Sequence, residues 1–509
     1  MSTWLALAFA SLPLQLAQRA LDAALARTLA LVVVDGSAQR AQVLACNESA
    51  RLAGVVPGMK LAAAQALVRG LVAVEHDPCR EQAALQELAC WAYQFSSQIA
   101  LFPASEGSGL LIETGASGRL FGGQAPLHQR MVRELHRLGY GAGDASAGTP
   151  AGARLLARAR AQGISVPASR GDGLRARLET LPLGLLGWEV PVTENLYTLG
   201  QHRIGDVLAL PRAAFARRFG AQRLLDLDRL LGLVPDPQVF FTPPQHFKAR
   251  MDLPADLAEL SGLLPPLEQL LRLLEGFLRG QGAGARALRL HVHHSPRRAG
   301  PRASTTICLA LALPEREPRR LLALFRERFA RASLAEAAIA LELELERMAA
   351  WMPLNASFLP PAPQAAGQGH DTLQLAQTLH ARLGPQGVFR LQALDDHRPE
   401  RSYRVLALEP ESAAAAVPAS GAAQRPLLIL PSPRRLPAPP AQGEPCYGGP
   451  LALLAGPERI EAGWWDLGAT APVAVQRDYF VARNRHGQTL WIYRELAAPH
   501  DWFLHGFFA

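Results

Sequence analysis

Short apolar runs alternate with longer amphipathic segments through the first 165 residues, and this alternation limits the fold more than any other feature of the sequence. Residues 29–35 and 109–113 are short, almost wholly apolar and bounded by polar or glycine residues, which predicts buried strands. Apolar residues at helical spacing predict helices over 79–94, 125–138 and 151–162. Strands and helices in this order predict an α/β or α+β module.

The chain then changes character twice. Residues 176–237 contain short helical pieces punctuated by glycine and no strand period, which predicts a small all-helical domain. Residues 246–348 combine predicted helices at 264–279 and 319–332 with strands, which indicates a second α+β module. Its expected strands are 288–293 and 305–313.

The C-terminal part is rich in proline and then in aromatic residues. Proline clusters at 360–363 and 431–440 predict linkers. Residues 480–482 and 489–493 flank His486-Gly487 and predict a hairpin in a compact β-rich module. In this module we expect Trp464, Trp465 and Trp491 to belong at least partly to a core, and the apolar end 502–509 to dock on its own module or on a partner.

Length, charge and cysteine usage set the class of protein. A chain of 509 residues is long enough for about three to five domains. Its 52 Lys and Arg against 44 Asp and Glu give a net charge of +8, mostly from arginine, which suits phosphate contact or simply reflects a GC-rich genome. Five scattered cysteines predict neither disulfides nor a zinc site, and we expect a cytoplasmic protein without a signal peptide or membrane span.

Several motifs resemble one family. Residues 43–59 resemble the fingers of Y-family translesion DNA polymerases, residues 148–160 their palm helix, and residues 181–210 their helix-hairpin-helix thumb. Further motifs resemble the ImuB branch of that family, whose members are regarded as polymerase-incompetent partners in a bacterial mutagenesis complex. These motifs are residues 456–466, 477–482 and 502–509.

The resemblance implies a fold and an order of domains. The fold would be an α+β multidomain, Y-family polymerase-like right hand with a C-terminal extension. The expected domains are a palm at 1–12 and 78–168, fingers at 13–77, a thumb at 169–238, a little finger at 245–349, a linker with a clamp-binding segment at 350–370, and a partner-binding region at 371–509.

The residues at the family's metal site depart from its pattern. Nucleotidyl transfer uses two metal ions held by carboxylates. Alignment through Phe9 puts Leu5 and Leu7 at the first acidic positions, and alignment through residues 111–114 puts Ser108 and Gly109 at the paired acidic position. We therefore expect no catalytic residue, no metal and no cofactor; the open alternative is that Glu106 or Glu113 is a displaced ligand, although Glu113 suits a strand end that bonds backbone or solvent.

The expected nucleotide and DNA contacts are partly retained. The resemblance places Glu48 at the family's triphosphate-binding Tyr and Arg51 at its triphosphate-binding Arg, and it places Arg154 near a family Lys. Arg51 and Arg154 are therefore candidate phosphate contacts; the alternative is that they are ordinary surface or packing residues. The thumb turn Gly187-Trp188-Glu189 has a Glu that would repel DNA, and Gly205-Asp206 resembles an ordinary helix N-terminus.

The main DNA contacts are therefore expected from little-finger arginines, with a solvated basic loop as the alternative. These are Arg286, Arg289, Arg297, Arg298 and Arg302. His291, His293 and His294 suggest a metal only weakly, because no Cys or carboxylate lies nearby in the sequence.

The resemblance also implies partners. Asn355, Phe358 and Leu359 loosely fit a peptide that docks on the sliding clamp; otherwise they form an apolar linker. The C-terminal region would bind a RecA-like accessory protein (ImuA) and an error-prone polymerase of the replicative alpha-subunit type. The expected function is a non-catalytic adaptor of DNA-damage-induced (SOS) mutagenesis and translesion synthesis. The alternatives are an active translesion polymerase with displaced ligands and a scaffold that no longer binds DNA.

Overall fold

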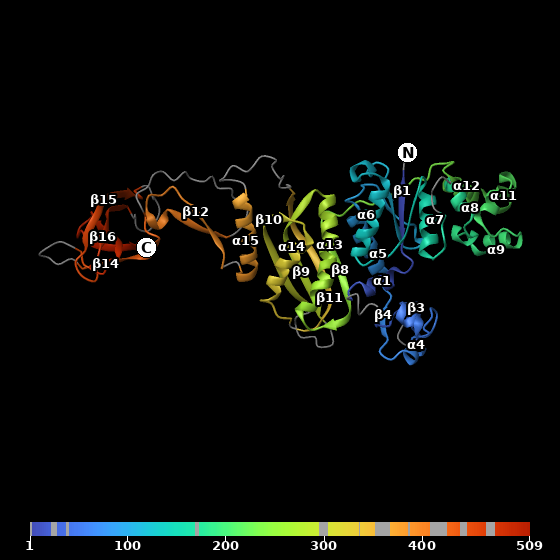
Figure 1. Cartoon of the computed structure of the whole chain (residues 1–509), viewed down its shortest axis with the longest axis horizontal. Helices are drawn as coiled ribbons and strands as arrows, with labels where there is room; N and C mark the ends of the chain where they lie inside the picture. The colour runs from blue at the N-terminus through green and yellow to red at the C-terminus, as the bar shows by residue number, and fades with distance from the viewer. Residues whose placement is uncertain are drawn as a thin grey trace. The chain divides into compact units, whose positions relative to one another are not determined.

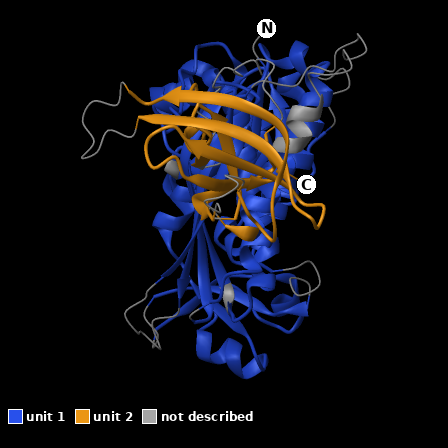
Figure 2. Cartoon of the chain, turned by 90° about the vertical axis from the view of Figure 1, so that its left-hand side faces the viewer, with its two compact units in different colours: residues 1–382 blue, residues 383–509 orange. Residues whose placement is uncertain are grey.

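The computed structural model describes residues 3–21, 28–36, 40–167, 173–294, 304–334, 336–351, 367–384, 387–407, 425–437, 445–464 and 474–508. The chain divides into two compact units, residues 1–382 and residues 383–509, which Figure 2 colours separately. No helix in these described ranges is long and apolar enough to cross a membrane.

The first unit begins with a four-stranded antiparallel sheet in the order β5-β6-β1-β7. Its strands are β1 (Trp4–Ala8), β5 (Ile99–Leu101), β6 (Gly109–Glu113) and β7 (Gly143–Ala147). Its helices are α1 (Leu12–Gln18), α5 (Pro78–Ala92), α6 (Gln124–Arg137) and α7 (Pro150–Ala161), with short 3-10 turns η1 (Ala104–Glu106) and η2 (Gly118–Phe121). In Figure 1, α5 and α6 lie on one side of β1 and α7 on the other. Both faces of β1 are therefore covered.

The alternation of side chains along β1 explains this sandwich. Leu5 and Leu7 belong to the hydrophobic cluster that includes α5 and α6, whereas Trp4, Ala6 and Ala8 belong to the cluster that includes α7. The helices predicted at 79–94, 125–138 and 151–162, and the strand predicted at 109–113, are confirmed to within two residues. Helix α1 begins at Leu12 and carries Pro13 in its first turn, where proline is tolerated.

A small module lies between α1 and α5 in the chain. Its three-stranded sheet has the order β3-β2-β4, with β2 and β4 parallel. The elements are β2 (Leu31–Asp35), β3 (Gln42–Cys46), α3 (Glu48–Leu52), α4 (Leu61–Leu67) and β4 (Val72–Glu75). Asn47 caps α3, since its Oδ1 accepts a hydrogen bond from the Ala50 N–H at 3.0 Å.

The regular elements of the described residues 173–237 are all helices, as the sequence predicted, apart from one isolated β-bridge between Pro182 and Arg203. They are α8 (Leu174–Glu179), η3 (Leu183–Leu186), α9 (Val190–Thr198), α10 (Ile204–Leu208), α11 (Arg212–Phe219) and α12 (Ala221–Leu231).

A second four-stranded antiparallel sheet follows, in the order β10-β9-β11-β8. Its elements are β8 (Lys248–Leu257), η4 (Leu260–Leu263), α13 (Leu264–Gly280), β9 (Ala283–His294), β10 (Ser304–Glu315), α14 (Pro318–Phe329) and β11 (Ala338–Ala350). Strands β9 and β10 and both helices were predicted, whereas β8 and β11 were missed. Helix α15 (Gly367–Leu383) ends this part of the chain.

Helices α5 and α13 join the two four-stranded sheets into one core. Trp91 of α5 and Leu270, Leu274 and Phe277 of α13 share one cluster, and none of the four is more than 2% exposed. The helices meet closely at Gly276, where an added Cβ would lie 2.5 Å from Cδ1 of Trp91. This close approach requires glycine.

The second unit is built from β-strands. A hairpin of β12 (Phe389–Ala393) and β13 (Tyr403–Ala407), with η6 (Pro399–Arg401) between its strands, precedes a five-stranded antiparallel sheet in the order β14-β18-β17-β16-β15. The five strands are β14 (Leu428–Leu436), β15 (Ala452–Ala462), β16 (Val475–Arg483), β17 (Thr489–Glu495) and β18 (Trp502–Phe507). The predicted hairpin around His486-Gly487 is confirmed, with Tyr479 opposite Tyr493.

Two expectations for this unit are wrong. Residues 431–436 are not linker but part of β14, an edge strand, where proline costs no hydrogen bond of the ladder. Trp464 is 76% exposed and is not a core residue, whereas Trp491 is buried; Trp465 lies outside the described residues. The apolar C-terminus docks on its own unit, because β18 lies between β14 and β17.

Candidate nucleic-acid interface and the positions of the metal ligands

The two leucines expected in place of the first carboxylates lie in the interior. Leu5 is paired with Ile112 and Leu7 with Leu110 of β6, and the two leucines are 1% and 0% exposed. Their side chains pack in the core that contains α5 and α6. A carboxylate at either position would be buried among apolar groups rather than directed to solvent or to a phosphate.

The two residues expected at the paired acidic position differ from each other. Gly109 is buried opposite Ala8, and an added Cβ would lie 2.5 Å from the Phe102 ring and 2.7 Å from the Leu7 carbonyl oxygen. Ser108 is half-buried, and its carbonyl oxygen accepts a hydrogen bond from the Phe9 N–H at 2.9 Å. Position 109 therefore has no room for any side chain, whereas position 108 has.

The two local carboxylates are already engaged. Oε1 of Glu113 accepts hydrogen bonds from the Gly115 N–H at 2.9 Å and the Thr3 N–H at 3.3 Å, so the side chain closes the turn after β6. Glu106 accepts a 2.9 Å hydrogen bond from Nε of Arg154. In the described part of the chain, no group of three or more His, Cys, Asp or Glu side chains is arranged to hold a metal ion.

A hollow of about 820 Å³ opens where β1 ends and β6 begins, beside the β3–α3 segment. Ser11, Arg51 and Ser108 line it, and Glu81 is the one carboxylate among the described lining residues. Glu81 forms a short contact with Nε2 of His76. Arg51 also faces Cys46, whose thiol pKa is raised by burial and lowered in part by this guanidinium. The hollow thus retains a cation and hydroxyl groups but little acid.

Arg154 is buried and contacts three polar side chains of the protein. It is 7% exposed on α7, and besides Glu106 it donates to Oε1 of Gln238 at 2.9 Å and lies 3.5 Å from Oδ2 of Asp236. These three partners come from η1 and from the segment after α12. A phosphate would have to displace them, so the geometry favours a bridge between segments over ligand binding.

The helical segment keeps the backbone turn but not an open phosphate site. Gly187 ends η3 in the left-handed conformation at φ 68°, and Glu189 pairs with Arg223. Trp188 donates its indole N–H to Oδ2 of Asp226 at 3.2 Å. The predicted helix start at Gly205-Asp206 is confirmed, since Oδ2 of Asp206 accepts from the Arg203 N–H at 2.8 Å at the beginning of α10.

The outward face of the second sheet carries mixed charge. Arg289, His291 and His293 alternate on β9, opposite a row of glutamates on β11. Arg289 forms a short ion pair with Glu346, and Nε2 of His291 lies 3.5 Å from Oε2 of Glu344. Glu342 is approached by Nζ of Lys248 at 2.8 Å and by Nε2 of His293 at 3.9 Å. Acid and base nearly balance on this face.

The remaining predicted DNA-binding and clamp-binding residues are either half-buried or lie outside the described residues. Arg286 lies on β9 and is half-buried. Arg297, Arg298 and Arg302, and the clamp-docking candidates Asn355, Phe358 and Leu359, lie outside the described residues.

Two sets of acidic or polar residues were not predicted from the sequence. The glutamates at 342, 344 and 346 alternate with leucines, a period-two pattern that would have revealed β11 and its outward acidic row. Asp236 and Gln238, which bind Arg154, carry no local signal because only the fold brings them to α7.

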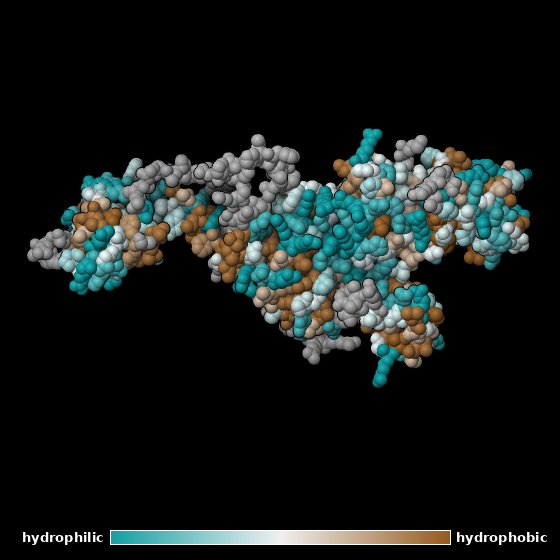
Figure 3. All heavy atoms as spheres, viewed as in Figure 1, coloured by the Kyte–Doolittle hydropathy of each residue, from teal (hydrophilic) through white to brown (hydrophobic). Residues whose placement is uncertain are grey.

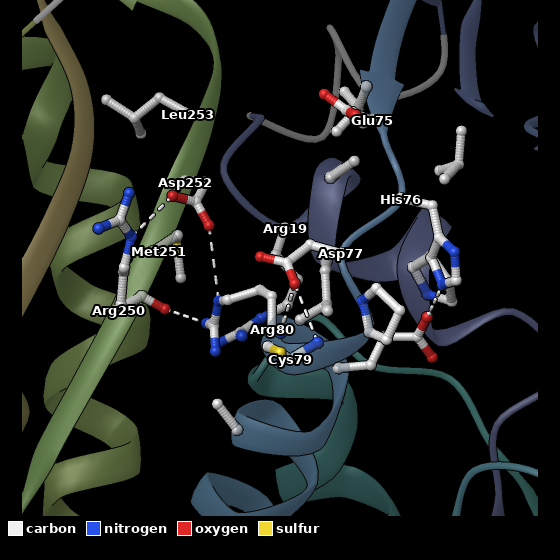
Figure 4. A pocket seen from close by; sticks show the side chains of 18 of the residues that line it. Arg19, Glu75, His76, Asp77, Cys79, Arg80, Arg250, Met251, Asp252 and Leu253 are labelled. Atoms are coloured by element: carbon white, nitrogen blue, oxygen red, sulfur yellow. Dashed lines mark hydrogen bonds and ion pairs between the residues drawn. The ribbon is translucent and has the colours of Figure 1, made fainter. Parts of the chain in front are cut away.

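A larger hollow of about 1040 Å³ lies between α1, β4, α5 and β8. In Figure 4, Arg80 of α5 reaches the carbonyl oxygen of Arg250 and the carboxylate of Asp252 on β8. Arg80 also donates to Oε1 of Glu87 at 2.9 Å. Both acidic and basic side chains line this hollow. We interpret it as a packing contact between α5 and the second sheet rather than as a ligand site.

Comparison with known proteins adds the family. The model of the impB/mucB/samB family matches residues 9–151. The chain is 31% identical over 482 residues to Protein ImuB of Caulobacter vibrioides, in strains NA1000/CB15N and ATCC 19089, covering 89% of this chain and 100% of each relative.

Solved structures of lower similarity include DinB from Sulfolobus solfataricus, at 13% identity and a TM-score of 0.35, covering 68% of this chain and 98% of that one. An insertion ternary complex of Dbh DNA polymerase matches at 14% identity and a TM-score of 0.38, covering 69% and 100%. The long, full-length similarity to Protein ImuB and the family match at its N-terminal part together show that this chain belongs to the ImuB family of Y-family polymerase-like proteins, with additional C-terminal β-sheets.

Proposed function

We propose that this protein is a non-catalytic adaptor of DNA-damage-induced mutagenesis, which binds primer-template DNA and brings a separate error-prone polymerase to a lesion. The observation that carries the proposal is the interior of the first sheet. Leu7 is fully buried, and position 109 has no room for a side chain. Two carboxylates at these positions would disrupt the core before they could hold a metal ion.

The proposal assigns the domains as the family resemblance implies. The first four-stranded sheet and its helices would be the palm, the three-stranded module the fingers, residues 169–238 the thumb and residues 245–349 the little finger. The C-terminal region would bind the polymerase and a RecA-like accessory protein of the ImuA type.

DNA contact is proposed through arginines of the three-stranded module and of residues 245–349. Arg51 is exposed on α3 and lines the hollow at the ends of β1 and β6. Arg286, Arg297, Arg298 and Arg302 complete the proposed set, with Arg289 once its pair with Glu346 is broken. Non-specific phosphate contacts of this kind weaken steeply with salt.

Clamp binding is proposed through Asn355, Phe358 and Leu359. A pull-down of the sliding clamp by the full chain should lose its signal with Phe358→Ala and Leu359→Ala. An unchanged pull-down with both variants would exclude this segment.

One observation favours a competing function. The glutamates at 342, 344 and 346 oppose the cations of the outward sheet face, which suits a protein partner better than a phosphate backbone. A scaffold that no longer binds DNA is therefore the second candidate.

Two measurements on the full chain separate these functions. Primer extension with Mg²⁺ or Mn²⁺ should give no incorporation; robust incorporation that disappears in Glu113→Ala would overturn the adaptor proposal in favour of an active polymerase. Binding to primed DNA should be detectable and should fall steeply between about 50 and 200 mM salt. Absence of any binding at low salt would favour the scaffold.

A further inference from the structure

Strand β10 forms a free edge of the second sheet, with β9 as its neighbour on the other side. Its register with β9 is regular from Ser304 to Ala310. In the described part of the chain, no hydrogen bond joins another segment to the outer side of this strand. At about 3.4 Å for each residue, the regular part presents an open row of backbone N–H and C=O groups roughly 24 Å long.

Both edges of the first sheet are engaged by other parts of the chain. On β7, the carbonyl oxygens of Asp144 and Ser146 accept hydrogen bonds from arginine side chains of α7 and α8, at 2.6 and 3.0 Å. On β5, the carbonyl oxygen of Ile99 accepts a hydrogen bond from the Phe241 N–H at 2.6 Å. Natural sheets protect their edges by such coverage, because an open edge pairs with other chains.

The remaining edge strands are charged, interrupted or short. The far edge of the second sheet is β8, which carries Lys248, Arg250 and Asp252. Strands β14 and β15, at the edges of the five-stranded sheet, contain proline and register shifts. Strands β3, β4, β12 and β13 have at most 5 residues each. Strand β10 differs from all of them, because its residues 304–313 include neither a charged residue nor a proline.

The open backbone groups of β10 identify the kind of segment that can cover it. Figure 3 shows apolar side chains, in brown, at several separate places on the visible surface, so apolar exposure by itself singles out no docking site. Backbone groups are more selective. In an antiparallel pair, every second residue directs both its N–H and its C=O to the neighbouring strand. An extended strand satisfies such a row, whereas a helix has already bonded its own N–H and C=O groups.

The side chains of β10 narrow the chemistry of that strand. Ile307, Leu309 and Leu311 are 7%, 1% and 3% exposed and share a core with α14, whereas the residues between them are exposed. A strand added to β10 continues both rows, so every second side chain would lie level with this buried apolar row. The cations of the outward face lie on β9, two strand spacings or about 10 Å from an added strand. A charged partner strand would therefore find no counter-charge beside it.

We propose that the free edge of β10 is the docking site for an extended, uncharged strand of a partner protein, in which every second side chain is apolar. The partner's strand becomes the fifth strand of the second sheet. Backbone hydrogen bonds supply the affinity, and the apolar row sets the register. The inference goes beyond the proposed function, in which residues 245–349 contact DNA, because it gives the same module a second, protein-binding surface.

The test uses the full chain and a fluorescein-labelled peptide as the probe, with about ten residues of alternating valine and threonine, enough to span the edge, and lysines at both ends for solubility. Fluorescence anisotropy should show saturable binding. The same peptide N-methylated along its backbone keeps its side chains but cannot donate hydrogen bonds, so it should lose binding. Hydrogen exchange of the β10 amides in residues 304–310 should slow at least about tenfold when unlabelled peptide is added, with no change in the other sheets.

Variants of exposed residues test the same edge without touching the core. Cys308→Lys combined with Ala310→Lys places two long cations on β10, as natural edge strands do to prevent pairing, and should weaken peptide binding at least about tenfold. The matched control is Ala323→Lys, at an exposed position of α14 in the same module, which should leave binding unchanged.

Three results would overturn the inference and leave the adaptor function standing, because no DNA or polymerase enters the test. The first is the absence of saturable binding up to about 1 mM peptide, or protection on strands other than β10. The second is equal binding of the N-methylated peptide, which would mean that side chains alone make the contact. The third is a concentration-dependent dimer of the native chain that Cys308→Lys abolishes, which would make a second copy the occupant.

Discussion

A carboxylate introduced at position 7 is expected to destabilise the first sheet instead of restoring a metal site. Leu7 is 0% exposed, so removing its side chain forfeits about 1.5–3 kcal/mol of apolar burial. An unpaired polar group in its place costs about 1–3 kcal/mol more. Complete burial raises the pKa of an aspartate by about 3–5 units, to near or above 7.

The charge adds a pH-dependent cost. At pH 7 a buried aspartate must either remain ionised or take up a proton that the unfolded chain, with a pKa near 3.9, does not bind. The cost of the proton is about 1.36 kcal/mol for each pH unit above 3.9, or about 4 kcal/mol at pH 7. The sum for Leu7→Asp is roughly 6–10 kcal/mol, comparable to the whole stability of a domain.

The variant Leu7→Asn separates the stability cost of the charge from the cost of the lost apolar burial. It lacks the titratable group, so its expected cost is about 3–6 kcal/mol at every pH. Because the folded-state pKa of the aspartate is raised, the two variants should be equally stable below about pH 4. The stability of Leu7→Asp should then fall progressively below that of Leu7→Asn as the pH rises from about 4 to the folded-state pKa. Urea unfolding of the full chain, followed by circular dichroism at pH 5 and pH 7, measures the difference.

Two results would refute this reasoning. Stability of Leu7→Asp within about 1 kcal/mol of Leu7→Asn at pH 7 would mean that position 7 is open to water. Stabilisation of Leu7→Asp by Mg²⁺, without a similar effect on Leu7→Asn, would mean that a metal site is latent in the sheet.

Three further substitutions test other parts of the fold by urea unfolding. Arg154→Met should cost about 1–3 kcal/mol, because it leaves the half-buried Asp236 carboxylate without its ion pair and Glu106 with Arg158 alone. Arg160→Met on the same helix removes a more exposed pair and should cost less than about 1 kcal/mol; equal costs would contradict the bridging role. Gly276→Ala should cost about 1–3 kcal/mol of stability, because the added methyl group clashes with the neighbouring helix α5. Gly148→Ala, whose added methyl group meets no atom within 4 Å, should be nearly neutral. A neutral Gly276→Ala would show that α5 and α13 separate easily. Burial lowers the pKa of His505 to about 4, so the unfolded chain takes up a proton between pH 6.5 and 4 that the folded chain does not. The free energy of unfolding of the C-terminal unit should therefore fall by up to about 3 kcal/mol as the pH falls through this window. A His505→Gln variant whose stability falls equally would refute that assignment.

Local pattern was enough to predict much of the secondary structure. The strand at 109–113, the helices α5, α6 and α7 and the hairpin around His486-Gly487 follow from apolar period and turn residues, which act over a few neighbouring positions. Strand β8 was missed because Pro254 and charged residues interrupt its pattern. Strand β14 was taken for linker because prolines are tolerated at a sheet edge, and edge position is a tertiary property.

The sequence by itself determined which chemical groups are present: leucine at positions 5 and 7, serine and glycine at 108 and 109, and an excess of arginine. Only the tertiary structure decided what those groups can do. It buried the leucines under α5 and α6, removed all space at Gly109, and engaged Arg154 with residues that lie 48 and 84 positions away along the chain. The physical reason is that burial and charge pairing depend on contacts between distant segments, whereas helix and strand periods are read from adjacent residues.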